Sequence, residues 1–363
     1  MTFGLVLLSF VQRVQNNPVL IWSFWGSAIM LVVWQVSLFR RSKALGRSLR
    51  TELRPQHYIQ ALVHLSVYAY WGWYWRPVYD FAWLLTAQLV FAYAFDMLLC
   101  WSRRHTYVLG FGPFPIIFST NLFLWFRDDW FYLQFLMIAV GFLGKEFVRW
   151  HRDGRSTHIF NPSAFSLGLF SLVLIATDSS NLTWGDQIAT TLNLAPNPYL
   201  FLFLLGLIVM YFFSITLVSA CAAAALFGLS ALYTSVTGVP FFHDAEIPIA
   251  VFLGLHLLVT DPSTSPRTAT GKAMFGVLYG LCVFGLYELL GSFGIPTFYD
   301  KLLGVPLLNL CVPAIDQAAR ALRRTDEPQP GGLEVIPRRA NLAFMAVWIL
   351  FFGAMAARGG ATD

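Results

Sequence analysis

Residues 145–166 read K-E-F-V-R-W-H-R-D-G-R-S-T-H-I-F-N-P-S-A-F-S, a polar and basic run that ends abruptly before an apolar segment. The change falls at Asn161-Pro162. Proline is tolerated in the first turn of a helix, because its missing N–H would have no partner there, and asparagine can cap the free amides of that turn. The stretch therefore predicts a helix that starts at Asn161 at a membrane surface, with several cations just outside.

A second stretch has the same form. Residues 259–267 read V-T-D-P-S-T-S-P-R and also lie between two apolar segments. Helix N-termini attract anions, so two such boundaries with nearby cations suggest one site made of helix ends and loops. The alternative is a pair of well-capped cytoplasmic loops. If the site is shared, Asn161 and Asp261 should lie within about 15 Å of each other, the width of a typical pocket.

The composition indicates an integral membrane protein. Of the 363 residues, 57% are hydrophobic and 12% are charged, whereas a soluble domain carries about 25% charged residues. The basic residues lie in loops between apolar segments, which is not a nucleic-acid-binding pattern. The four cysteines form no C-x-x-C pair, so neither a disulfide framework nor an iron–sulfur cluster is expected.

The apolar segments predict an all-α polytopic membrane protein with about 10–12 transmembrane helices. The expected spans are 18–39, 57–75, 81–101, 107–126, 130–148, 161–176, 199–218, 219–239, 247–260, 272–290, 302–315 and 340–357. The loop 40–54 holds six basic residues and one acid, which places it in the cytoplasm under the positive-inside rule. Five of the 24 Lys and Arg residues then fall outside and 19 inside, and segment 316–339 is cytoplasmic.

Three of these segments are short or interrupted. Segment 107–126 contains Gly112, Pro113 and Pro115, segment 247–260 is short for a full span, and segment 302–315 contains Pro306 and Pro313. Irregular backbone at membrane depth survives only inside protein or along a cavity, and broken helices often build the binding site of transporters.

Three motifs together resemble one family. They are Lys145…Arg149…His158-Ile159-Phe160-Asn161-Pro162-Ser163-Ala164-Phe165, then Thr260-Asp261-Pro262-Ser263-Thr264-Ser265-Pro266, and Leu307-Leu308-Asn309-Leu310-Cys311-Val312-Pro313-Ala314-Ile315-Asp316. Their order and spacing are similar to those of the NqrB/RnfD family. These proteins are membrane subunits of the sodium-pumping NADH:quinone reductase and of the Rnf ferredoxin:NAD complex.

The resemblance implies a membrane core over residues 79–317, built as two inverted five-helix halves that resemble urea transporters. N-terminal helices with a basic cytoplasmic loop (1–78) would precede it, and a cytoplasmic segment with one last transmembrane helix (318–363) would follow. It also implies a bacterial inner (cytoplasmic) membrane protein. The implied partners are the lipid bilayer and other redox-complex subunits or a soluble electron donor.

The external flavin motif of the family is missing. Family members carry FMN linked through its phosphate to a Thr in Ser-Gly-Ala-Thr, and the nearest sequence here is Ala189-Thr190-Thr191. Without the glycine, the easy turn and close backbone approach are lost. Covalent FMN at Thr190 or Thr191 is therefore not expected, and a divergent, UnbU-like branch of the family fits better.

The leading hypothesis is a flavin-binding subunit for electron transfer, possibly coupled to ion translocation, that holds riboflavin or FMN non-covalently on the cytoplasmic side. The cofactor-binding residues implied by the resemblance are Lys145, Arg149, Arg155, His158, Asn161, Asp261, Ser263, Thr264 and Asn309. Asp96 lies inside an apolar segment, where it could serve an ion path or a hydrogen-bonded structural role. The alternative function is a cofactor-free transporter or channel of the same fold. We expect no self-contained catalytic site and no metal site.

Overall fold

The structure, a computed structural model, describes residues 1–41, 46–152, 154–243, 245–322 and 336–357. Contacts divide the chain into two compact units. Unit 1 comprises Met1–Leu143 and Ser179–Gly185, and unit 2 comprises Gly144–Asp178 and Asp186–Asp363.

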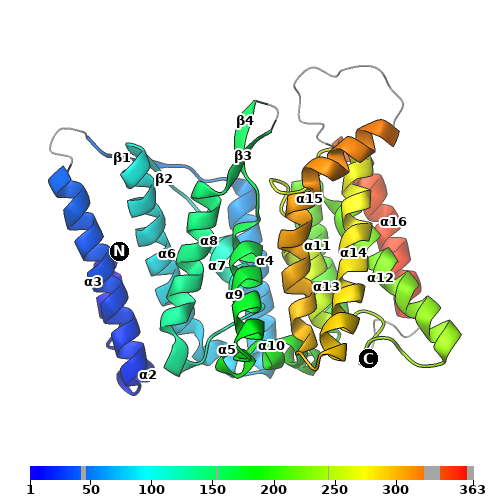
Figure 1. The fold of residues 1–363 in the computed structure, drawn as a ribbon, viewed down its shortest axis with the longest axis horizontal. Coiled ribbons are helices and arrows are strands. Elements are labelled where there is room, and N and C mark those ends of the chain that lie inside the picture. Colours follow the sequence, from blue (N-terminus) through cyan, green and yellow to red (C-terminus); the bar gives the residue numbers. More distant parts are fainter. Residues whose placement is uncertain (42–45, 153, 244, 323–335, 358–363) are drawn as a thin grey trace. The chain divides into compact units, whose positions relative to one another are not determined.

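Long helices dominate both units (Figure 1). Up to the middle of the chain the helices are α1 Thr2–Leu8, α2 Gln12–Gln15, α3 Pro18–Arg41, α4 Pro55–Tyr74, α5 Pro77–Asp80, α6 Ala82–Arg103, α7 Pro113–Asn121, α8 Tyr132–Phe147 and α9 Pro162–Ala176. They continue with α10 Gly185–Thr191, α11 Pro198–Phe213, α12 Thr216–Thr237, α13 Ile249–Leu257, α14 Ala269–Ser292, α15 Asp300–Leu322 and α16 Arg338–Ala357. The strands are β1 Ser48–Thr51, β2 Thr106–Leu109, β3 Arg149–Arg152 and β4 Arg155–His158, and short 3₁₀ turns include η1 Asp128–Trp130 and η4 Thr297–Tyr299.

Six of the described helices are long and apolar enough to cross a membrane, namely α3, α6, α12, α14, α15 and α16. The number becomes seven if residues 185–194 and 198–213, which meet at a bend of 102°, are taken as one span. The expected all-α polytopic membrane fold is confirmed. The count of 10–12 spans stays a prediction, because α4, α7, α8, α9, α11 and α13 are too short or too polar to qualify on length and composition alone.

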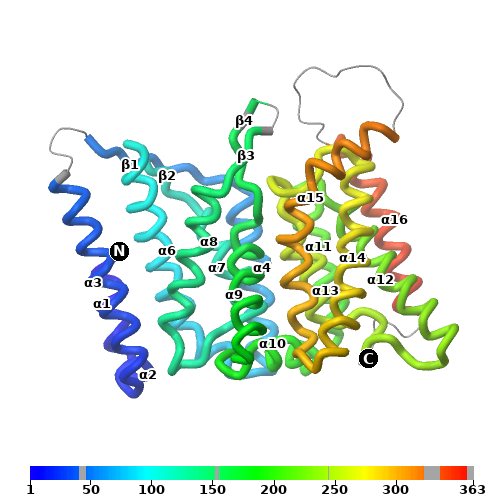
Figure 2. Tube along the Cα trace, in the orientation of Figure 1, coloured from blue at the N-terminus to red at the C-terminus, as the bar shows by residue number. Residues whose placement is uncertain are grey.

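In unit 1 the cytoplasmic-type loops lie at one end. Strand β1 after α3 pairs in parallel with β2 after α6, with Ser48 opposite Thr106. Helix α2 lies at the other end (Figure 2), as does α5 (Figure 1). This arrangement agrees with the predicted membrane topology, in which α3 and α6 both end on the side of the basic loops.

The interrupted segment 107–126 folds as β2, the nine-residue helix α7 and a buried extended stretch. The end of α7 is held by three fully buried amide side chains. Asn121 donates to Gln88 at 2.6 Å, and the Gln134 side-chain amide donates to both at 3.2 Å. Gln134 also accepts the backbone N–H of Phe126 at 3.0 Å. The last carbonyls of α7 also have donors, because the Asn121 amide donates to the carbonyl of Ile117 at 2.8 Å and the Trp125 indole N–H donates to that of Asn121.

A five-helix order recurs along the chain. The run α4, α6, α7, α8, α9 and the run α11, α12, α13, α14, α15 both have a nine-residue helix in third place, α7 and α13. This agrees with two related halves. Their inversion and the likeness to urea transporters remain predictions.

Within unit 2, α14 packs closely on α12 through two glycines spaced four residues apart. A Cβ at Gly276 would collide with the carbonyl oxygen of Val218, and one at Gly280 would lie 2.9 Å from that of Ala222. Such small-residue contacts let two membrane helices approach at backbone distance. The α12–α14 pair is therefore a central contact of this unit.

The expectation of a short, proline-broken segment at 302–315 is wrong. Helix α15 runs without interruption from Asp300 to Leu322 and contains both Pro306 and Pro313. A Cβ added at Gly168 of α9 would lie only 2.7 Å from the ring of Pro306. Because Gly168 has no side chain, the proline ring has room there. The helix bends toward its C-terminal end instead of breaking (Figure 1), which is the usual effect of proline inside a supported helix.

Candidate functional site

The basic stretch before α9 forms a β-hairpin that the sequence analysis missed. Strands β3 and β4 pair antiparallel, with Arg149 opposite His158, and Asp153-Gly154 separates them. Gly154 has φ +75°, a conformation that glycine adopts at little cost. Asp-Gly between two short strands is the strongest short-range hairpin signal, and it was present in the sequence. His158 ends β4, three residues before Asn161 and in the same unit.

Asn161 caps α9 as predicted. Its side-chain oxygen accepts the N–H groups of Ser163 at 3.1 Å and Ala164 at 3.3 Å, and it also accepts the Ser163 hydroxyl at 2.8 Å. Pro162 takes the first helical position. The local signals of the motif were sufficient for this part of the site.

The short helix α13 ends inside unit 2, where its last carbonyls need donors. Ser219 of α12 donates to the carbonyl of Leu255 at 2.6 Å, and Thr260 donates to that of His256 at 2.8 Å. The Asn161 side-chain amide donates to the carbonyl of Leu258 at 3.0 Å. Asn161 therefore serves two helices, because it caps the start of α9 and the end of α13.

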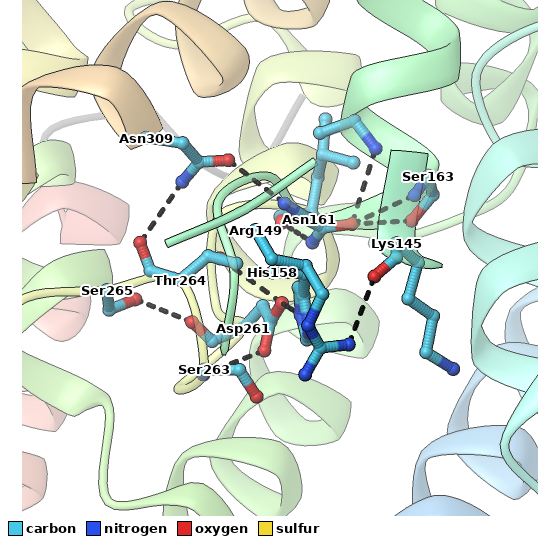
Figure 3. Close-up of polar contacts among 12 residues, drawn as sticks. Lys145, Arg149, His158, Asn161, Ser163, Asp261, Ser263, Thr264, Ser265 and Asn309 are labelled. Atoms are coloured by element: carbon cyan, nitrogen blue, oxygen red, sulfur yellow. Dashed lines mark hydrogen bonds and ion pairs between the residues drawn. The ribbon is translucent and has the colours of Figure 1, made fainter. Parts of the chain in front are cut away.

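Asn309 of α15 joins the two motifs (Figure 3). Its side-chain oxygen accepts the backbone N–H of Asn161 at 3.1 Å, and its amide donates to the carbonyl of Thr264 at 3.1 Å. Asn309 thus bridges the Asn-Pro and Asp-Pro stretches, which the shared-site interpretation expected to lie close together. Asn161 and Asn309 are 7% and 1% exposed, so they form a buried frame.

Asp261 is the charged centre of the loop after α13. Its carboxylate accepts the N–H of Ser263 at 2.9 Å and the hydroxyl of Thr264 at 3.2 Å, and it lies 3.7 Å from Nε2 of His158. Burial raises the pKa of Asp261, but the hydrogen bond and charge of His158, with the bonds from Ser263 and Thr264, bring that pKa below its ordinary value. The two side chains are 19% and 20% exposed, so this pair remains reachable.

Arg149, one of the predicted cations, is bonded to its own hairpin and to the helix before it. The guanidinium of Arg149 donates to the carbonyl of Ser156 at 2.7 Å, to its hydroxyl at 3.0 Å and to the carbonyl of Lys145 at 3.4 Å. The Lys145 side chain points away from the Asp261 loop in Figure 3. Arg155 lies in β4, but its side chain is outside the described residues. Arg149 thus stabilises its own hairpin.

The other predicted residues lie elsewhere. Asp96 of α6, in unit 1, accepts the hydroxyl of Tyr107 at 3.2 Å, which agrees with a hydrogen-bonded role. Thr190 and Thr191 are in α10, where their hydroxyls donate to backbone carbonyls of the same helix, Thr191 to Gln187 at 2.6 Å. These hydrogen bonds do not bear on whether a flavin is attached at Thr190 or Thr191.

A buried ion pair at the start of α15 also escaped the sequence analysis. Lys301 and Asp300 are 4% and 1% exposed, and Nζ lies 3.0 Å from Oδ1. The signal was two adjacent opposite charges directly before an apolar run. Charges at such sites are retained only when paired.

These observations describe an integral multi-pass membrane protein whose polar site lies where a short helix, a capped helix start and a hairpin meet. A model of the NQR2, RnfD, RnfE family matches residues 136–323, and the chain belongs to this family. It is similar to the D subunit of the ion-translocating oxidoreductase complex of Actinobacillus succinogenes, with 37% identity over 94 residues, 26% of this chain and 24% of that protein. The corresponding protein of Aeromonas salmonicida is 37% identical over 84 residues, 23% of this chain and 22% of that protein. The matched part thus spans about a quarter of the length of these relatives. No solved structure matches the chain.

Proposed function

We propose that this chain is an electron-transfer subunit of a membrane redox complex, with a non-covalently bound flavin at the His158–Asp261 site. The observation that carries the proposal is the convergence of the Asn-Pro and Asp-Pro motifs on one buried frame, with a partly exposed His–carboxylate pair beside it. The named relatives belong to an ion-translocating oxidoreductase complex, which supports partner subunits and coupled ion movement. The proposed location is the bacterial inner membrane.

The residues present suit the ring of a flavin better than its phosphate. His158 and the loop 261–264 offer donors and acceptors at the surface of the frame, whereas Arg149 is engaged within its hairpin. Riboflavin therefore fits this site better than FMN. When bound, a flavin supplies the redox chemistry. The protein's part is to fix the Asp261 loop through Asn309 and to hold a proton or hydrogen bond at His158 Nε2.

Purification of the full chain in mild detergent with added riboflavin or FMN tests the proposal. We expect a flavin absorption spectrum and release of the flavin into the supernatant after acid precipitation. His158→Ala and Asp261→Asn should lower flavin occupancy several-fold. His151→Ala, an exposed histidine of the same hairpin, is the matched control.

A second candidate is a transporter or channel without a cofactor. The observation in its favour is that the side chains of Asn161 and Asn309 are hydrogen-bonded to backbone groups of the protein and not directed at a ligand. Colourless protein that binds neither flavin would favour this function. A flavin that stays with the acid-precipitated protein and is lost on Thr190→Ala or Thr191→Ala would instead restore the covalent linkage of the family.

A further inference from the structure

A cavity of about 620 Å³ lies in unit 1, beside α2, α5 and η1. Its wall includes four aromatic side chains, Tyr79, Trp83, Trp125 and Trp184. Trp125 is buried, whereas Trp83 is 54% and Tyr79 38% exposed, as expected for rings at a membrane–water interface. Residues of α2 and α5 line the cavity. Both helices lie at the end of unit 1 opposite β1 and β2 (Figure 1), the end that the predicted topology places outside the cytoplasm.

The cation in the wall is neutralised by the protein. Arg13 donates to both carboxylate oxygens of Asp128, at 3.0 and 2.8 Å, and to the backbone carbonyl of Asp80 at 2.7 Å. Asp80 also lines the cavity; the residue is exposed, and its carboxylate forms no ion pair or hydrogen bond within the described residues. Of the charged residues in the lining, Arg13 and Asp128 neutralise each other, and Asp80 keeps its negative charge.

The aromatic rings of this region already attract cations. The guanidinium carbon of Arg127 lies 4.8 Å from the ring centroid of Trp184, and that of Arg76 lies 5.6 Å from the ring centroid of Tyr79. A ring face attracts a positive group electrostatically, most strongly when the ring is an indole. Trp83 is an exposed indole that lines the same cavity as Asp80.

We propose that this cavity binds an ammonium group, primary or quaternary, against Trp83 and the carboxylate of Asp80. The Asp80 carboxylate attracts an ammonium group, and the Trp83 indole favours an organic cation over a small hydrated ion. The group can come from the headgroup of a zwitterionic lipid or from a soluble amine, since both carry the same chemistry. This site is independent of the flavin proposed at His158 and Asp261.

Calorimetric titration with tetramethylammonium chloride tests the site. The full-length protein is held in phosphatidylglycerol nanodiscs, which contain no lipid ammonium, and sodium chloride provides the reference titration. We expect saturable binding that Asp80→Asn and Trp83→Leu each weaken about fivefold, from the loss of one exposed ion pair or one cation–π contact. Asp186→Asn and Trp22→Leu remove an exposed carboxylate and an exposed indole that do not line the cavity, and they should bind as the unaltered chain does.

A second set of nanodiscs distinguishes the two sources. If phosphatidylethanolamine competes with tetramethylammonium, the lipid headgroup supplies the group; if it does not, the ligand is a soluble amine. Absence of saturable binding, or equal affinities for Asp80→Asn, Trp83→Leu and the two controls, would overturn the proposal. Trp83 is 54% exposed, so its variant remains informative even if Asp80→Asn fails to fold.

Discussion

At the scale of single residues, the polar side chains of the site differ in how many of their hydrogen bonds are made within the protein. Asn161 and Asn309 are committed to backbone groups, whereas His158 and Asp261 are partly exposed. The capping role of Asn161 could be predicted because its partners in α9 lie two and three residues away. The link through Asn309 could not be predicted from local sequence, because it joins residues separated by 148 positions.

Removing Asn309 should destabilise the protein and open the site. Asn309→Ala leaves the N–H of Asn161 and the carbonyl of Thr264 without their partner, and each buried unsatisfied group costs about 1–3 kcal/mol. We expect a lower unfolding temperature in detergent, measured by differential scanning fluorimetry. Leu310→Ala, next to it but 54% exposed, is the control and should change the unfolding temperature little. Equal effects of the two substitutions would contradict the framing role.

Asp261 should make stability depend on acid pH. Its pKa is lowered in the fold, so the carboxylate stabilises the native state above its ordinary pKa of about 4, and this contribution is lost as the pH falls through the lowered value. The unfolding temperature should therefore fall less on acidification for Asp261→Asn than for the unaltered chain. Asp186→Asn provides an exposed-carboxylate comparison. An identical acid profile for all three proteins would refute this assignment.

At the scale of elements, the sequence predicted features that depend on one helix alone. It did not predict features that depend on the packing of two helices. The run 247–260 was recognised as short because its apolar length is a local property, and α13 has nine residues. The two prolines of α15 predicted a break, but Gly168 on another helix accommodates Pro306. The β3–β4 hairpin was missed although Asp153-Gly154 signals it. The surrounding basic residues were interpreted as a loop between two membrane segments, and no strands were expected there.

The α12–α14 contact gives an element-scale prediction. Gly276→Val must push the backbone of α12 away at Val218, and overpacking of this kind costs about 1–3 kcal/mol. Thermal unfolding and the yield of monodisperse protein should both decrease. Gly285→Val lies in the same helix, but nothing is within 4 Å of its Cβ position, so it should be tolerated. Similar losses for both variants would show that helix propensity, and not this contact, sets the effect.

At the scale of the whole molecule, charge distribution predicts the orientation in the membrane. Leu53, 62% exposed in the basic loop after β1, should be cytoplasmic, whereas Val239, 60% exposed in the turn after α12, should face outside. In a chain with its four native cysteines replaced, Val239→Cys should react with an impermeant maleimide in intact cells. Leu53→Cys should react only after permeabilisation. Labelling of Leu53→Cys in intact cells would invert the threading.

The ends of the two nine-residue helices differ in how they respond to voltage. The end of α7 is held by Gln88, Asn121 and Gln134, which carry no formal charge, whereas the loop after α13 carries the carboxylate of Asp261 beside His158. Moving one elementary charge across the full bilayer changes its energy by about 2.3 kcal/mol per 100 mV. A neutral amide has no net charge and shows no such change. Of these two helix ends, the loop after α13 is therefore the one whose holding groups include a formal charge on which a membrane potential can act.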